Sequence, residues 1–361
     1  MTRTHAPDYT VILHAEAMAN VAAYRNQLHN EGIHLAGARL ARELEGSAAI
    51  EADALLECLL NTKLPLLFAD RAVRGDGSDW TGRELSLLGD IGIAADVTIF
   101  DDGRHAGPRI HEQPFKGTLL FVPGALLLNG CGGIPVDWDA VVRDRHIDQQ
   151  AYDRLHERRL LPLLRHADAT AAASGTRALV TMPGLGCGEF AGPFRVRMGE
   201  HLRKALIALL ERHAALLPNI AAIYFDPYRE CKNDRVRFGD LSLMVRPLTQ
   251  GNEGKPQLCR PEAYAEDGDD FGGCTFFSFV AWDHVSWPGN DFYGGMRSTD
   301  DGVKAAATSS MLAMTGIEGH YDSASNCYRP PAGFTTWGQV IEEYGLTLET
   351  RGRLKVIGMA G

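Results

Sequence analysis

The sequence predicts an α/β protein in which helices cover a largely buried, mixed β-sheet. Two observations indicate this fold class. Short apolar runs alternate with amphipathic, helix-like patterns over most of the 361 residues. Glycine-rich or acidic loops directly follow several of these runs, as in α/β proteins that build binding sites at the carboxyl ends of their strands. At roughly 150 residues per domain, the length fits one large domain with additions or two domains.

Composition narrows the class of protein. The chain is 45% hydrophobic and 23% charged, and its formal net charge of -10 argues against a broad nucleic-acid-binding face. No window approaches the ~20 apolar residues of a membrane span, and the N-terminus lacks the apolar core of a signal peptide. Seven scattered cysteines without C-x-x-C spacing fit a reducing compartment. We therefore expect a cytoplasmic protein without nucleic-acid or membrane partners. Secretion as an effector without a classical signal peptide stays open.

Residues 1–63 predict an N-terminal helical extension packed on the core. Apolar residues recur there at helical spacing in three stretches separated by glycines, at 15–30, 33–44 and 48–60.

Residues 64–361 predict the main α/β domain. Short apolar runs predict strands at residues 64–69, 95–100, 118–122, 178–182, 220–226, 241–245 and 274–281, and an edge strand in the alternating tail 346–358. Helical patterns occur at residues 81–88, 139–173, 193–217 and 336–344, with the Arg and His residues of 139–173 expected on a solvated face. Residues 107–115, 251–273 and 323–337 predict loops, of which 251–273 is expected to be an exposed excursion.

The loop at residues 183–192, PGLGCGEFAG, lies between a predicted strand and a predicted helix that starts at Pro193. The glycines leave backbone N–H groups free to face an anion, and a helix dipole there favours negative charge. The spacing differs from that of a P-loop, and no lysine follows it. We favour contact with a phosphate, with tight packing of the turn as the alternative.

The segment at residues 282–308, WDHVSWPGNDFYGGMRSTDDGVKAAAT, holds four carboxylates and follows a predicted strand. Carboxylate clusters bind Mg²⁺ or Ca²⁺. Alternatively, one carboxyl group acts as general acid or base while another stabilises positive charge during cleavage of a glycosidic bond. Asp283 directly follows the apolar run, a poor place for a merely solvated acid, so we favour a functional role for it.

The other polar residues of this segment have structural alternatives. Asp291 follows Pro-Gly-Asn and can also be a turn former. Asp300 is interpreted as a helix-start residue in a capping sequence. Arg297 pairs with the acids or holds a phosphate with two hydrogen bonds. His284 has no second histidine at ligand spacing, so no zinc site is predicted.

The segment WPGNDFYGGMRSTDDGVKAAAT, together with VTMPGLGCGEFAG, resembles the macrodomain-like ADP-ribosylhydrolases of the MavL type. The resemblance covers residues 64–316 and is sharpest in these two loops. It implies a macrodomain-like three-layer α/β/α sandwich with a mixed central sheet. Asp283, Asp291 and Asp301 are implied to be the catalytic carboxylates. The implied ADP-ribose contacts are Pro183, Gly184, Gly186, Cys187, Gly188, Phe190, Asn290, Gly294, Gly295 and Arg297.

The activity implied by this resemblance is removal of ADP-ribose from ADP-ribosylated protein by cleavage of the N-glycosidic bond to an arginine side chain. Ubiquitin is one candidate acceptor, because the family is named for an effector that acts on it. No cofactor is firmly implied, and Mg²⁺ stays open. Two alternatives remain: a non-catalytic reader of ADP-ribose, and a metal-dependent phosphoesterase that uses the same acids on an ADP-ribose derivative.

Overall fold

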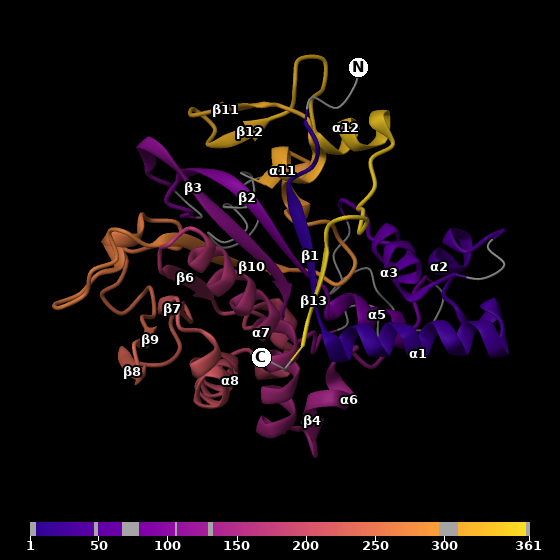
Figure 1. Cartoon of the computed structure of the whole chain (residues 1–361), viewed down its shortest axis with the longest axis horizontal. Helices are drawn as coiled ribbons and strands as arrows, with labels where there is room; N and C mark the ends of the chain where they lie inside the picture. The colour runs from indigo at the N-terminus through magenta and orange to yellow at the C-terminus, as the bar shows by residue number, and fades with distance from the viewer. Residues whose placement is uncertain are drawn as a thin grey trace.

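The computed structural model describes residues 5–46, 50–66, 79–104, 107–128, 133–295 and 310–358, without the side chain of Asp291. Within these ranges, nine strands form a central sheet in the order β13-β1-β2-β3-β10-β6-β7-β9-β8 (Figure 1). The run from β3 to β9 is parallel, whereas β2 is antiparallel to both β1 and β3, and β8 is antiparallel to β9. The predicted mixed sheet is confirmed.

The N-terminal part contributes one strand and several helices. Its elements are β1 (Tyr9–His14), α1 (Ala15–Glu31), η1 (Ile33–Leu35), α2 (Ala38–Glu43) and α3 (Ala52–Asn61). The three helical stretches expected from sequence are therefore confirmed in type. Strand β1 was not predicted: it lies inside the proposed extension 1–63, yet it pairs with β2 and β13.

The next segment forms one helix that covers a face of the sheet, followed by a long β-hairpin. The Thr81 hydroxyl accepts a hydrogen bond from the Glu84 N–H, and the Glu84 carboxylate accepts one from the Thr81 N–H, so a capping box starts α5 (Gly82–Gly89). Strands β2 (Gly92–Asp101) and β3 (Ile110–Pro123) follow. The loop predicted at residues 107–115 is therefore wrong from Ile110 onward, because these residues continue the antiparallel pairing with β2 beyond its apolar part. The strand predicted at 64–69 is reduced, in the described residues, to one bridge between Leu64 and Ser286.

The middle of the chain supplies the helices of the other face. These elements are α6 (Trp138–Val141), β4 (Val142–Arg143), β5 (His146–Ile147), α7 (Gln149–Ala173), β6 (Ala178–Pro183), η2 (Glu189–Phe194), α8 (Met198–His213) and η3 (Ala214–Leu216). The predicted helix at 193–217 thus starts later than expected. Pro193 belongs to η2, where Gly192 breaks the helical geometry with φ +51°.

The last third completes the sheet and adds a small hairpin. Its elements are β7 (Ile220–Asp226), β8 (Asp234–Phe238), β9 (Leu241–Val245), η4 (Pro261–Tyr264), β10 (Thr275–Trp282), α9 (Asn290–Tyr293), α11 (Met311–Thr315), β11 (His320–Asp322), β12 (Cys327–Arg329), α12 (Trp337–Tyr344) and β13 (Leu354–Ile357). Strand β8 was missed, and β12 lies within the predicted loop 323–337. The excursion 251–273 is not wholly exposed, since Leu258 and Tyr264 are buried.

Two buried apolar clusters lie on opposite faces of the sheet. Along β7, Ala222 and Tyr224 enter one cluster, whereas Ile223 and Phe225 enter the other, as the two-residue period of a strand requires. Helices α1, α3 and α5 cover the first face, and α7 and α8 cover the second. The predicted three-layer α/β/α sandwich is confirmed.

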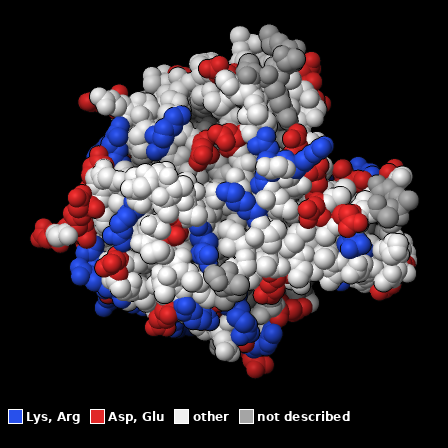
Figure 2. All heavy atoms as spheres, viewed as in Figure 1, with Lys and Arg blue, Asp and Glu red and all other residues white. Residues whose placement is uncertain are grey.

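The surface carries both signs of charge. On the face shown in Figure 2, acidic and basic side chains are interspersed. In the described ranges, no helix combines the length and apolarity that a membrane span requires.

Candidate functional site

Three strand-end loops lie at one edge of the sheet. Strands β3, β10 and β6 are adjacent and parallel, with Trp282 of β10 aligned with Pro123 of β3. The loops that leave their carboxyl ends therefore start side by side. This edge is where open α/β sheets bind ligands.

The loop after β3 and the glycine loop after β6 touch through their backbones. A Cβ added to Gly124 would lie 2.3 Å from the backbone N of Gly186, and Gly186 itself has φ +70°. Farther along, the Leu127 N–H donates to the Phe190 carbonyl at 2.7 Å. Only residues without a side chain permit this approach, so the glycines of the predicted loop have a clear packing role.

The predicted glycine loop does not lead directly into a long helix. Pro183 is buried, Gly184, Gly186, Cys187 and Phe190 are half-buried, and Gly188 is exposed before η2 starts. At the start of α8, the Gly199 N–H donates to the Glu230 carboxylate at 2.8 Å. The long helix expected to start at Pro193 begins only at Met198, so its N-terminus does not adjoin the glycine loop, and the Glu230 carboxylate lies at its first turn.

The glycine loop and the acidic segment lie against each other. The Phe190 ring is 6.3 Å from the imidazole of His284, centroid to centroid, and His284 directly follows Asp283. The structure therefore brings the two loops that carry the sequence resemblance together at this point.

Asp283 directly follows β10, as expected, and is only 4% exposed. Its Oδ1 accepts a hydrogen bond of 2.9 Å from the Val285 N–H. The backbone carbonyls of Asp283 and His284 both accept hydrogen bonds from the buried ammonium of Lys63, at 3.2 and 2.6 Å. A residue of the N-terminal part thus lies directly under the predicted catalytic segment.

A buried ionic network supports the loop after β3. Arg159 of α7 contacts both Asp90 and Asp137, and it also donates to the Gly124 carbonyl at 2.9 Å. Asp137 in turn accepts from the Leu126 N–H at 2.8 Å. Burial alone would raise the pKa of Asp137, but the adjacent guanidinium holds that pKa well below its ordinary value.

His284 closes this network from the acidic segment. Its Nε2 lies 3.5 Å from Asp137 Oδ2, and both side chains are almost fully buried. Burial lowers the pKa of His284, with Asp137 opposing the shift. The imidazole therefore couples the start of the acidic segment to the loop after β3.

Sequence reasoning missed this network. Arg159 and His156 were expected on a solvated face of their helix, but they are 2% and 1% exposed. The sequence signal was weak, since the partners Asp90 and Asp137 lie far from α7 along the chain. A buried arginine became recognisable only from the tertiary contacts.

The acidic segment continues through the short helix α9. Asn290 is 4% exposed and donates through Nδ2 to Ser286 Oγ at 3.3 Å. Gly294 is half-buried and Gly295 is exposed with φ +80°. Arg297, Asp300, Asp301 and the side chain of Asp291 lie outside the described residues, so the predicted grouping of three carboxylates stays a prediction.

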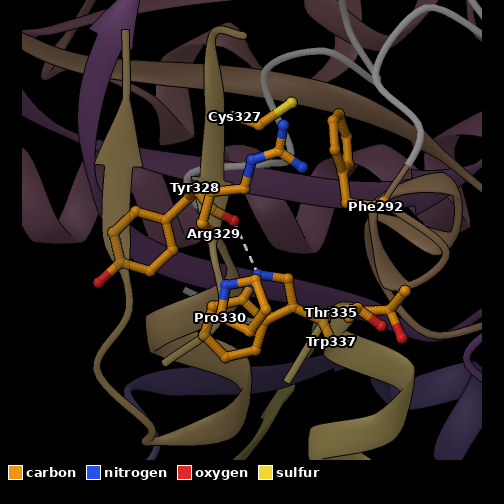
Figure 3. A pocket seen from close by; sticks show the side chains of 9 residues that line it. Phe292, Cys327, Tyr328, Arg329, Pro330, Thr335 and Trp337 are labelled. Atoms are coloured by element: carbon orange, nitrogen blue, oxygen red, sulfur yellow. Dashed lines mark hydrogen bonds between the residues drawn. The ribbon is translucent and has the colours of Figure 1, made fainter. Parts of the chain in front are cut away.

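A small pocket lies beside this segment, between α9 and the C-terminal hairpin formed by β11 and β12 (Figure 3). Phe292 and Gly295 line one side, and Cys327, Arg329 and Trp337 contribute to the rest. The Arg329 guanidinium points toward the Phe292 ring (Figure 3). Residues after 316, beyond the range of the sequence resemblance, therefore lie beside Gly295, one of the implied ADP-ribose contacts.

Another carboxylate stands at the same sheet edge. Asp226 ends β7, and burial raises its pKa to about 6 despite hydrogen bonds from the Tyr228 and Leu248 N–H groups. In the part of the chain that the structure describes, no group of three His, Cys, Asp or Glu side chains is placed to hold a metal ion. This does not test the acidic triad, two of whose carboxylates are not described.

Comparison with known families gives one result. The model of a family described as macrodomain effector MavL matches residues 9–334 of this chain. The matched range includes β1, both predicted loops and the C-terminal hairpin. No curated protein matches the chain.

Proposed function

This chain belongs to the macrodomain effector MavL family, and on that premise we propose that it is a hydrolase that removes ADP-ribose from protein. Macrodomain membership itself indicates ADP-ribose binding or processing. The finer proposal is cleavage of the N-glycosidic bond between ADP-ribose and an arginine side chain. One observation carries it: the acidic segment and the glycine loop meet, because the ring of His284, the residue after Asp283 at the end of β10, lies 6.3 Å from the Phe190 ring of the loop that contains Gly184, Gly186 and Gly188.

The proposed binding mode follows the sheet edge. The diphosphate of ADP-ribose lies on residues 184–188, where backbone N–H groups and small side chains allow close approach. The distal ribose then extends toward the acidic segment, near Asn290 and Gly295. Arg297 is available, in this proposal, for two hydrogen bonds to a phosphate.

The proposed reaction is hydrolysis at the anomeric carbon. One of Asp283, Asp291 and Asp301 accepts a proton from water as the water oxygen bonds to that carbon. The bond from carbon to the guanidine nitrogen breaks, and the nitrogen receives a proton from a second carboxyl group. The third orients ribose hydroxyls. Negative charge at this place stabilises the oxocarbenium-like transition state, and a carboxylate matches the two N–H donors of a guanidinium.

The test uses three substrates that carry ADP-ribose on arginine, glutamate or serine, one of them ADP-ribosylarginine ubiquitin. Mass spectrometry follows release of ADP-ribose with and without chelator. We expect release from arginine only. Asp291→Ala and Asp301→Ala are expected to abolish release while calorimetry still detects ADP-ribose binding. Asp300→Ala is the matched control, since we interpret Asp300 as a helix-start residue, and it should retain turnover.

Other outcomes identify the alternatives. Near-normal turnover in both Asp291→Ala and Asp301→Ala contradicts the proposal. Binding of ADP-ribose without release from any linkage indicates a reader, and phosphate release that chelator abolishes indicates a phosphoesterase. Three negative charges favour the enzyme, because a binder of an anionic ligand gains nothing from nearby carboxylates.

The proposed setting is the cytoplasm. The scattered cysteines support it, since Cys58, Cys231, Cys259 and Cys274 are free thiols. Nucleic acid and membrane play no part in the proposed activity.

A further inference from the structure

Lys63 is a buried lysine beneath the predicted catalytic segment. It follows α3 and is 1% exposed. Its Nζ donates to the carbonyl oxygens of Asp283 and His284, at 3.2 and 2.6 Å, and lies 4.1 Å from the centre of the Trp282 ring. These contacts all involve residues 282–284, where β10 ends and the acidic segment begins.

The backbone around Lys63 is paired with the same segment. The Leu64 N–H donates to the Val285 carbonyl at 2.8 Å, and the Trp287 N–H donates to the Leu64 carbonyl at 3.0 Å. The Trp287 indole also donates to the Lys63 carbonyl at 3.2 Å. Residues 63 and 64 therefore lie alongside residues 283–287 as a short parallel partner.

A lysine is a costly choice for this position. Removing an ammonium from water is unfavourable unless hydrogen bonds and charge compensate for it. Burial lowers the pKa of Lys63 to about 7, and the nearby Asp283 carboxylate opposes the shift. An apolar side chain would avoid this cost, so the reason for a lysine here lies in the groups to which it donates hydrogen bonds.

What Lys63 holds is the backbone that orients Asp283. Beyond Trp282 the β ladder ends, and the next two carbonyls point into a buried region where water is excluded. Buried carbonyls need donors. Even a neutral amine keeps two N–H groups, so Lys63 can donate to both carbonyls whether or not its amine is protonated.

We propose that Lys63 is a positioning residue for Asp283, which fixes the direction of that carboxylate by holding the Asp283 and His284 carbonyls. Its kinetic consequence rests on the proposed function. Its structural consequence does not, because the order of residues 283–287 can be measured without any substrate.

The kinetic test compares the full-length chain with Lys63→Met and Lys63→Gln. Methionine has similar length without donors, whereas glutamine keeps two donors without charge. We expect kcat of Lys63→Met to fall by about 10- to 100-fold, as for a misplaced catalytic group, with KM and the calorimetric ADP-ribose affinity changed by less than about threefold. Lys63→Gln should recover part of the loss in kcat.

A matched control separates positioning from general loss of stability. Tyr264 is fully buried, and its hydroxyl donates to the Pro256 carbonyl and accepts from the Cys259 N–H, so neither bond involves the predicted catalytic segment. Tyr264→Phe removes both of these hydrogen bonds and is expected to lower the melting temperature without changing kcat. If kcat of Tyr264→Phe fell as far as kcat of Lys63→Met, the positioning role of Lys63 would be overturned.

The second test is amide hydrogen exchange followed by mass spectrometry. In Lys63→Met, peptides covering residues 283–287 should exchange at least several-fold faster, while those covering β7 stay unchanged. Unchanged exchange together with unchanged kcat overturns the proposal. If Lys63→Met does not fold, Lys63→Gln supplies both readouts. If the wild type releases no ADP-ribose from any linkage, the proposed function fails, and exchange still decides the role of Lys63.

Discussion

The guanidinium of Arg159 and the carboxylate of Asp137 share two hydrogen bonds, of 2.8 Å from Nη2 to Oδ1 and 3.0 Å from Nη1 to Oδ2. Their side chains are 0% and 2% exposed. The same two residues hold the Gly124 carbonyl and the Leu126 N–H. The pair therefore determines the path of the loop that faces Gly186.

Removing the cation from this pair should destabilise the fold strongly. Arg159→Met leaves the Asp137 carboxylate buried without its main partner, and we expect the free energy of unfolding in urea to fall by about 3–5 kcal/mol. The exposed pair of Arg195 and Glu189, at 62% and 50% exposure, provides the control. Arg195→Gln should change the free energy by less than about 1 kcal/mol. Equal effects in the two variants would contradict a structural role for the buried pair.

Lys63 predicts an unusual dependence of stability on pH. Its pKa in the folded protein is lowered to about 7, whereas in the unfolded chain it is roughly 10.4. Between these values the unfolded chain binds more protons, so the free energy of unfolding rises with pH. Urea unfolding at pH 7 and pH 9.5 should show a gain on the order of a few kcal/mol in the wild type relative to Lys63→Met.

This comparison isolates the lysine. Burial raises the pKa of Cys231 to about 12 and that of Cys259 to about 11, so both thiols lower stability as pH rises above their unfolded values. That loss is common to wild type and Lys63→Met and cancels in the difference. Identical pH dependence in the two proteins would show that Lys63 is not buried as the structure has it.

Gly124 should tolerate no side chain. A Cβ there would lie 2.3 Å from the Gly186 nitrogen, which is backbone and cannot rotate away. Gly124→Ala is therefore expected to lower the melting temperature and to weaken ADP-ribose binding by at least about tenfold, since the loop must shift by a fraction of an ångström. Calorimetry and thermal unfolding measure the two effects.

Gly82 is the matched position for this substitution. It lies in the first turn of α5, and an added Cβ meets open space. Gly82→Ala should leave binding unchanged and stabilise the protein slightly, by up to about 1 kcal/mol. Wild-type binding by Gly124→Ala would show that the two loops do not need their close contact.

The N-terminal part should be required for folding. Strand β1 pairs on both sides, with β2 and with β13, and Lys63 and Leu64 pair with the acidic segment. A variant that lacks residues 1–63 is expected to be insoluble or to unfold without cooperativity, whereas an independent extension would leave a stable remainder. Size-exclusion chromatography and thermal unfolding distinguish these outcomes and so test the predicted boundary at residue 63.

Local sequence patterns predicted those strands in which the run of apolar residues matches the burial seen in the structure. Strands β6, β7, β9 and β10 are continuous apolar runs because both of their faces are covered, and their positions were predicted within about two residues. Strand β1 is equally apolar, but it passes directly into α1 without a turn, so no local signal separated it from the helix. The first half of β3 is half-solvated, and only its pairing with β2 makes it a strand.

The position of Asp283 after a buried strand was predictable from the sequence, whereas its catalytic role stays a prediction. Asp283 stands out because an acid directly after a buried strand has few structural explanations. Lys63, Arg159 and Asp137 do not stand out, since the bonds from Lys63 to His284 and from Arg159 to Asp137 join residues more than twenty positions apart. Their roles depend on tertiary contacts, which composition and periodicity do not encode.

The pairing of β13 with β1 affects how the chain is exposed during its synthesis. Four residues near the C-terminus cover the outer edge of β1, a strand made more than three hundred residues earlier. Until they emerge, β1 presents unpaired N–H and C=O groups beside Val11 and Leu13, an edge to which another nascent chain can add. Protection of this edge therefore depends on residues 354–357, and their loss exposes β1 before it affects the site.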